Sequence, residues 1–230
     1  NYSIIYLDFF LNRFLPKMPI FYSIFKYINK KNTSLISKAE ALGRIEYSGF
    51  EIISHFFESK LYFIAKKRKK PFNKSFSYSL LYKSIRLGKD QKKIKVFKLR
   101  TMHPYSEYLQ NYITKTQGYN SKGKIKDDFR VPLWGRIFRK FWIDELPQLY
   151  NLIIGDLNLI GPRPVSERFF LDIPKDLQIK RSKYKPGCIP PYVSLNMKSD
   201  LKNSFKSEMI YLNEKEKNPF ITDLKYFFMA

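Results

Sequence analysis

The sequence is poor in the residues that build metal centres and disulfide bonds. It has one cysteine, Cys188, and its two histidines, His55 and His103, are far apart along the chain. A single cysteine excludes an internal disulfide and fits a reducing compartment. No Cys or His cluster has zinc-site spacing, which disfavours structural zinc. Cys188 has no base near it in sequence, so we interpret it as a small buried or turn residue rather than a nucleophile.

Nucleotide-binding loops and long apolar runs are missing as well. The chain contains neither a Gly-x-Gly-x-x-Gly pattern nor a Walker loop, which disfavours a Rossmann or P-loop nucleotide site. No uncharged apolar run approaches the roughly 18–20 residues that a membrane span needs. Residues 1–30 are rich in aromatic and aliphatic side chains, but charges and two prolines interrupt them. They predict either an interfacial segment or an arm packed on the domain.

Acidic residues are scarce beside basic ones. Lys and Arg number 43 against 20 Asp and Glu, a formal net charge of +23. Such an excess implies an anionic partner: a membrane surface, a nucleotide or a nucleic acid. The basic run at residues 66–71 is either a solvated linker or a phospholipid contact. Basic residues interleaved with Tyr and Phe would suit single-stranded nucleic acid, but no nucleic-acid motif is present, and we expect no such partner.

The first third of the chain predicts a small helix–strand–strand unit. Residues 37–40 read Ser-Lys-Ala-Glu, which is a capping box, so a helix should begin there and end near Gly43 or Gly49. Residues 50–57 and 61–65 then predict two strands joined by a turn.

The stretch from Trp142 to Asn151 organises the rest of the sequence. Pro147 is tolerated only in the first turn of a helix, so we expect a helix that begins at about Asp144, with this carboxylate at or near the N-cap. Gly155 is a natural C-terminal stop. One apolar stripe recurs at helical spacing, at Leu146, Leu149, Tyr150 and Ile153. Taken alone, this pattern also describes an ordinary acidic cap on a core helix.

Arginines on both sides of the Asp144-Glu145 pair favour a more specific interpretation. Two carboxylates bracketed by arginines at loop-like positions are typical of a metal and phosphate site. The arginine-bearing segments are Asp128-Phe129-Arg130, Gly135-Arg136, Arg139 and Gly161-Pro162-Arg163-Pro164.

Together these residues resemble the bacterial sugar transferases, the monotopic polyprenyl-phosphate phosphoglycosyl transferases. The resemblance covers roughly residues 80–190. It rests on the order and spacing of Lys98-Leu99-Arg100-Thr101-Met102, Asp128-x-Arg130, Gly135-Arg136, Arg139, Asp144-Glu145-Leu146-Pro147-Gln148-Leu149 with Asn151, Gly155-Asp156 and Gly161-Pro162-Arg163-Pro164.

The resemblance implies transfer of a sugar-1-phosphate from a UDP-sugar to a polyprenyl phosphate, with Mg²⁺ and release of UMP. It implies a covalent intermediate on Asp144, while Glu145 assists through the metal or as a proton acceptor, and both carboxylates serve as metal ligands. Phosphoryl transfer needs in-line positioning and positive charge around the equatorial oxygens, which agrees with this assignment. The implied phosphate- and substrate-binding residues are Arg100, Asp128, Arg130, Arg136, Arg139, Arg163 and Lys185. Lys185 stands where an arginine is usual and would lose bidentate geometry.

The chain departs from this family near its N-terminus. Family members usually carry a long re-entrant apolar helix before the Arg-x-Gly segment, and here that position holds only residues 61–65 and the lysine run. Residues 1–75 resemble instead the preface of a shorter, Bacteroidetes-type branch. We therefore expect peripheral attachment to the cytoplasmic face of the bacterial inner membrane, through aromatic residues 1–25 and an anionic lipid surface.

The predicted architecture is α/β (α+β), a compact, helix-rich catalytic domain with a small preface. We place the interfacial and helix–strand–strand preface at residues 1–75 and the catalytic domain at residues 76–230. The predicted activity belongs to polysaccharide or glycoconjugate synthesis. A catalytically silent basic membrane adaptor and a nucleic-acid binder remain as alternatives, and self-association into homo-oligomers stays open.

Overall fold

A computed structural model gives the fold, and mixed helices and strands confirm the predicted α/β class. The structure describes residues 35–68, 70–72, 78–118 and 125–230, together with Ile4, Leu7, 10–11 and 15–18. Most of the predicted interfacial arm at residues 1–30 therefore lies outside the described residues. The chain divides into two compact units, one of residues 1–80, 100–120 and 125–144, the other of residues 81–99, 121–124 and 145–230. The predicted domain boundary near residue 75 stays a prediction.

The first unit combines short helices with one β-hairpin. Its core joins Leu42, Ile52, Leu109, Tyr112 and Ile113, all buried. Its elements are η2 (Leu15–Lys17), α3 (Lys38–Tyr47), β1 (Phe50–Phe57), β2 (Leu61–Lys67), η4 (Ser106–Leu109), α4 (Gln110–Gln117) and α5 (Leu133–Lys140).

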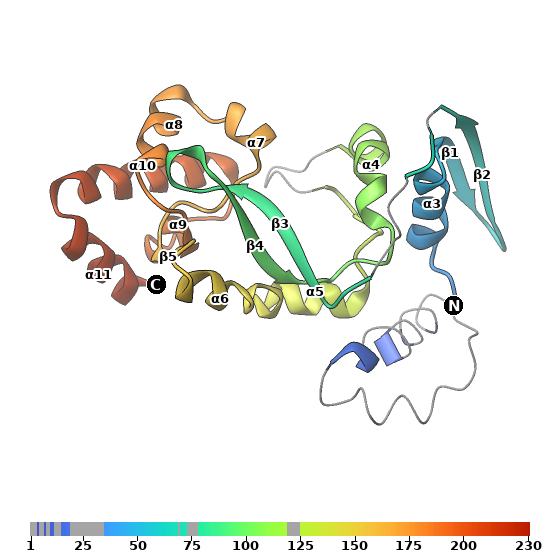
Figure 1. Cartoon of the computed structure of the whole chain (residues 1–230), viewed down its shortest axis with the longest axis horizontal. Coiled ribbons are helices and arrows are strands. Elements are labelled where there is room, and N and C mark those ends of the chain that lie inside the picture. The colour runs from blue at the N-terminus through green and yellow to red at the C-terminus, as the bar shows by residue number, and fades with distance from the viewer. Residues whose placement is uncertain are drawn as a thin grey trace. The chain divides into compact units, whose positions relative to one another are not determined.

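The predicted capping box and hairpin are confirmed. The Ser37 hydroxyl accepts a hydrogen bond from the backbone N–H of Glu40, so α3 begins where the motif predicts. β1 and β2 pair antiparallel beside α3, with a register shift between Ile52 and Ser54 (Figure 1). β2 runs to Lys67, two residues beyond the prediction, because the lysine run continues the ladder opposite Phe50 and Glu51.

The second unit is helix-rich and contains two small sheets. β3 and β4 form an antiparallel hairpin, and β5 and β6 form a parallel pair. In Figure 1 the red C-terminal helices α10 and α11 follow each other directly along the chain. The elements are β3 (Leu81–Leu87), η3 (Lys89–Gln91), β4 (Lys93–Leu99), α6 (Gln148–Ile153), β5 (Asn158–Ile160), α7 (Glu167–Leu171), α8 (Lys175–Ser182), β6 (Gly187–Ile189), α9 (Pro191–Ser194), α10 (Leu201–Lys217) and α11 (Pro219–Met229).

The core of the second unit links the hairpin, β5 and helices α7, α8, α10 and α11. It contains Leu87, Ile160, Phe170, Ile173, Leu177, Tyr211, Leu212 and Tyr226. Lys215 is buried among these elements, and its ammonium donates to both oxygens of Asp223, at 2.6 and 2.7 Å, and to the Tyr211 hydroxyl at 2.8 Å. This ion pair joins α10 to α11, because a buried ammonium needs a carboxylate partner.

The predicted helix start at Asp144 is wrong. Residues 143–145 form the 3₁₀ turn η5 (Ile143–Glu145), which spans the division between the units, and α6 begins only at Gln148 with Pro147 as its N-cap. Pro147 disfavours helical backbone at the preceding residue, which separates the turn from the helix. The predicted stop is confirmed, since Gly155 follows the helix with φ of +76°.

The apolar stripe of α6 points away from the core. Gln148 and Asn151 are the buried residues of this helix. The stripe residues are 54–82% exposed: Leu146, Leu149, Tyr150 and Ile153. The other interpretation of this stretch, an acidic cap on a helix whose apolar stripe is buried in the core, is therefore excluded. Among the described residues, no helix combines the length and the apolar character that crossing a bilayer requires.

Candidate functional site

Glu145 lies in the second unit between two cations. Lys98 Nζ and Arg163 Nη2 both donate to the same oxygen, Glu145 Oε1, at 2.7 and 2.5 Å. Lys98 comes from the end of β4, and Arg163 comes from the Gly-Pro-Arg-Pro turn that follows β5. The structure thus brings together one predicted carboxylate, one predicted arginine and a lysine to which we assigned no role. Lys98 stands in the Lys98-Leu99-Arg100-Thr101-Met102 segment of the motif, and that signal was available in the sequence.

The two cations keep Glu145 ionised. Burial opposes its charged form, but the Arg163 and Lys98 charges and hydrogen bonds from Lys98 and Gln148 outweigh this effect and lower the pKa of Glu145. The Glu145 side chain is 17% exposed and that of Arg163 is 42% exposed. A half-exposed guanidinium beside a carboxylate can exchange this partner for a phosphate group, for which it has matching geometry.

Asn151 holds α6 against β4. Its side-chain nitrogen donates to the Lys95 carbonyl at 2.7 Å, and its side-chain oxygen accepts from the Phe97 backbone N–H at 2.9 Å. Asn151 is fully buried, so both groups need these partners. Because Lys98 directly follows Phe97, this amide sets the distance between Lys98 and the start of α6. The motif contained Asn151, but only the fold shows its structural role.

Arg163 is held by its main chain. Arg181 Nη2 donates to the Arg163 carbonyl at 2.6 Å, and the Arg163 backbone N–H donates to Glu208 Oε1 at 3.3 Å. Arg181 also forms a buried ion pair with Glu208. Burial raises the pKa of Glu208 above its ordinary value, and the Arg181 charge offsets only part of this rise. Sequence reasoning missed Arg181 and Glu208, because they stand in α8 and α10 within ordinary charged patterns.

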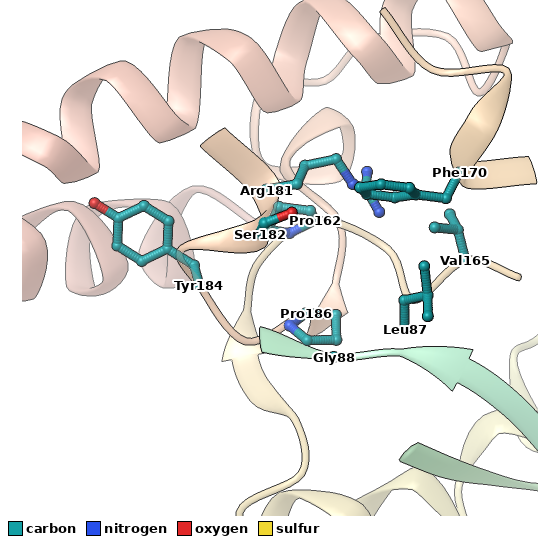
Figure 2. Close-up of a pocket in the computed structure, with 9 residues that line it drawn as sticks. All are labelled: Leu87, Gly88, Pro162, Val165, Phe170, Arg181, Ser182, Tyr184 and Pro186. Carbon is teal, nitrogen blue, oxygen red and sulfur yellow. The ribbon is translucent and has the colours of Figure 1, made fainter. Parts of the chain in front are cut away.

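The Gly-Pro-Arg-Pro turn is packed closely against the start of β6. A Cβ on Gly187 would lie 2.1 Å from the backbone nitrogen of Gly161, so only glycine allows this approach. A small pocket lies beside the turn, and Figure 2 shows Arg181 extended toward Phe170 at its border. The predicted phosphate ligand Lys185 is exposed and immediately precedes Pro186, another residue that lines the pocket.

Asp144 and the remaining predicted cations belong to the first unit. Asp144 is 8% exposed, in η5. Arg136 and Arg139 are both exposed on α5, and Arg139 Nε donates to the Thr101 hydroxyl at 2.9 Å. Thr101 stands in the same motif as Arg100, so this bond fixes α5 against the segment after β4.

Arg100 and Arg130 make contacts of different kinds. Arg100 donates to the Ser79 carbonyl at 3.1 Å and lies 3.5 Å from Glu107, with its side chain 13% exposed. Arg130 is 3% exposed and donates to both carboxylate oxygens of Asp128 at 2.8 Å. It also donates to the Ser106 carbonyl and to Gln110. These contacts give the Asp128–Arg130 pair a structural role, and its role toward substrate stays a prediction.

The described residues contain no group of three or more His, Cys, Asp or Glu side chains arranged to hold a metal ion. Mg²⁺ commonly uses one or two carboxylates together with substrate phosphates and water, so the consecutive Asp144 and Glu145 are the donor type it needs. Both cations near Glu145 bond to a single oxygen, Oε1. The Glu145 carboxylate therefore has the chemistry to take part in holding a Mg²⁺ ion that arrives with a diphosphate substrate.

Comparison with known proteins identifies the family. The model for "Bacterial sugar transferase" matches residues 71–230. This chain belongs to the bacterial sugar transferase family. The recognised resemblance is confirmed, and the match includes each of the motif segments on which it rested.

Curated relatives have related names. The uncharacterized sugar transferase EpsL of Bacillus subtilis is 32% identical over 149 residues, 64% of this chain and 65% of EpsL. The exopolysaccharide production protein ExoY of Sinorhizobium fredii is 35% identical over 94 residues, 39% of this chain and 42% of ExoY. The undecaprenyl-phosphate galactose phosphotransferase of Salmonella typhimurium is 37% identical over 90 residues, 37% of this chain and 19% of that protein. The chain thus spans less than two thirds of the length of each of these relatives.

Proposed function

We propose that this sugar transferase moves a sugar-1-phosphate from a UDP-sugar to a polyprenyl phosphate in surface-polysaccharide or glycoconjugate synthesis. The observation that carries the proposal is the Glu145 carboxylate held between Lys98 and Arg163, directly after Asp144 in the family motif. Cations of this kind neutralise the phosphates of a nucleotide-sugar, and relatives named for undecaprenyl-phosphate sugar transfer favour this function over a silent adaptor or a nucleic-acid binder.

The proposed first step uses Asp144 as a nucleophile. A carboxylate oxygen of Asp144 attacks the β-phosphorus of the UDP-sugar, and the bond from that phosphorus to the bridging oxygen breaks. UMP leaves with the bridging oxygen and both bonding electrons, and the sugar phosphate stays on Asp144. In the second step a phosphate oxygen of the lipid attacks the same phosphorus and releases the Asp144 carboxylate. The products are the polyprenyl diphosphate sugar and free enzyme.

Arg163 and Lys98 would stabilise the charge that develops on the transferred group. Arg163 offers a planar fork to phosphate, and Lys98 supplies a compact charge from the strand end. Glu145 would accept a proton from the lipid phosphate if that group enters protonated. Mg²⁺, bound with the donor diphosphate by Asp144 and Glu145, would supply further charge neutralisation.

A membrane-dissolved acceptor fits the exposed apolar side of α6. Leu149 and Ile153 on this helix are 54% and 82% exposed, a few residues after Glu145. We propose that the protein works at the cytoplasmic face of the inner membrane, where a polyprenyl chain would lie against this surface. Attachment through residues 1–25 and self-association stay predictions.

The test measures UMP release from a panel of UDP-sugars. With donor alone, the wild-type protein should release about one UMP per active site and gain the mass of one sugar phosphate. Asp144→Asn should abolish both, whereas Asp172→Asn, an exposed carboxylate outside the motif, should leave both unchanged. Near-normal UMP release by Asp144→Asn would disprove the covalent step. Oligonucleotide binding without UMP release from any donor would favour the nucleic-acid alternative.

A further inference from the structure

The β1–β2 hairpin of the first unit has an apolar outer surface that the proposed chemistry does not use. Cross-strand partners share a face of the hairpin, and the pairs Ser54–Ile64 and Phe56–Tyr62 lie on one face. The other face carries Ile52 and His55, which contact the core and Tyr112 of α4. The face with Phe56, Tyr62 and Ile64 therefore points away from the unit to which the hairpin belongs.

This outer face is exposed and carries aromatic rings. Phe56 is 55% exposed, Tyr62 44% and Ile64 59%, and the rings of Phe56 and Tyr62 stack at 4.8 Å. Around the hairpin, Ile53, Phe57 and Phe63 are also 48–57% exposed. Neighbouring exposed apolar side chains of this kind mark an interaction site.

Basic residues surround this apolar surface at both ends of the hairpin. Residues 50–70 contain six basic and two acidic residues. Lys60 lies in the turn, and Lys66 and Lys67 lie at the open end, all exposed. Glu51, one of the two acids, is already paired with Arg68 at 2.6 Å and Lys115 at 3.5 Å. The surroundings of the apolar face are therefore strongly positive.

We propose that the outer face of the β1–β2 hairpin inserts into the interfacial region of an anionic phospholipid membrane. Aromatic rings favour the boundary between headgroups and acyl chains, and the lysines at both ends would contact lipid phosphates. A second copy of the chain would bring like-charged lysine clusters together, which opposes pairing of two hairpins. Nucleic acid would use the cations but would leave Ile53 and Ile64 without apolar partners. The proposal concerns attachment only and does not depend on the transfer chemistry.

The first experiment places a fluorescent reporter on the hairpin of the full chain. In a Cys188→Ser background, Ile64→Cys is labelled with the environment-sensitive dye NBD, and Lys175→Cys on α8 is labelled as the control. Vesicles of phosphatidylcholine with phosphatidylglycerol should shift the NBD emission at position 64 to the blue and leave the NBD emission at position 175 unchanged. No shift at Ile64 would overturn the proposal. A shift that appears when the protein is concentrated without lipid, with a dimer mass by light scattering, would overturn it in favour of a second copy.

The second experiment measures vesicle binding of variants by sedimentation. The triple change Phe56→Ser, Tyr62→Ser and Ile64→Ser should weaken partitioning by about tenfold or more, since these side chains would no longer enter the apolar layer. Lys66→Gln with Lys67→Gln should reduce binding to anionic vesicles and its salt sensitivity. Melting temperatures show whether each variant is folded. If the triple serine variant melts at a lower temperature than wild type, the NBD emission of the Ile64→Cys protein is the test of the proposal. Unchanged vesicle binding by a folded serine variant would disprove the proposal. An NBD shift and binding that occur with oligonucleotides but not with vesicles would disprove it as well.

Discussion

The Arg181–Glu208 pair offers the sharpest test of how the Gly-Pro-Arg-Pro turn is positioned. Both side chains are buried, 7% and 2% exposed, and both bond to the main chain of Arg163. We consider Glu208→Leu alone and Glu208→Leu with Arg181→Met. Removing one partner of a buried ion pair leaves an uncompensated charge and costs about 3–5 kcal/mol. Replacing both partners by apolar residues of similar volume is often neutral, so the double variant should regain most of this stability.

Unlike stability, kcat/KM should not recover in the double variant. Glu208→Leu removes one of the two main-chain contacts that hold Arg163, and the double variant removes both. In the double variant the backbone of Arg163 is therefore less firmly held, and its guanidinium is less well placed beside Glu145. Loss of one charge-assisted contact to phosphate, worth about 1.5–3 kcal/mol, corresponds to roughly a 10- to 150-fold fall in kcat/KM for the UDP-sugar. The double variant should therefore be stable and still slow. Urea denaturation measures the free energy of unfolding, and UMP release measures kcat/KM.

A second ion pair between the same helices is the control. Lys180 of α8 pairs with Glu216 of α10 at 2.5 Å in a more exposed setting, and Glu216→Gln should change neither stability nor kcat/KM appreciably. If the double variant regained both stability and full kcat/KM, Arg181 and Glu208 would be structural residues only. A single Glu208→Leu variant as stable as wild type would contradict the buried ion pair itself.

Two further predictions concern Glu145 and Gly187. The lowered pKa of Glu145 means that its ion pairs stabilise the fold fully above the ordinary glutamate range, about pH 4.3, and are lost as pH falls through the lowered value. The difference in Tm between wild type and Glu145→Gln should thus stay constant from neutral pH to about pH 5 and shrink only in stronger acid, and a difference that grows on acidification would contradict it. Gly187→Ala should lower Tm and kcat/KM together, because its Cβ would lie 2.5 Å or less from backbone atoms of Gly161 and Ile160, and unchanged thermal melting would disprove this close packing.

The sequence alone determined the local structure of the N-terminal elements and the identity of the motif. The Ser37 cap, the hairpin strands and the Gly155 stop follow from interactions within a few residues, and local rules describe these well. The family could be recognised because the motif residues stand at characteristic spacings along one chain. The placement of the helix start at Asp144 failed at Pro147, where the restriction on the preceding residue outweighed the capping preference.

Only the tertiary structure decided which charged residues meet and which side of α6 is buried. Lys98 and Arg163 reach Glu145 because β4, η5 and the turn after β5 come together from positions 47 and 18 residues away in sequence. No local pattern contains that information. The periodicity of α6 located an apolar stripe but not the direction it faces, since hydrophobic spacing is the same for a stripe turned inward or outward. The buried amide of Asn151, bonded to β4, turns the polar side of α6 inward and leaves the apolar side exposed.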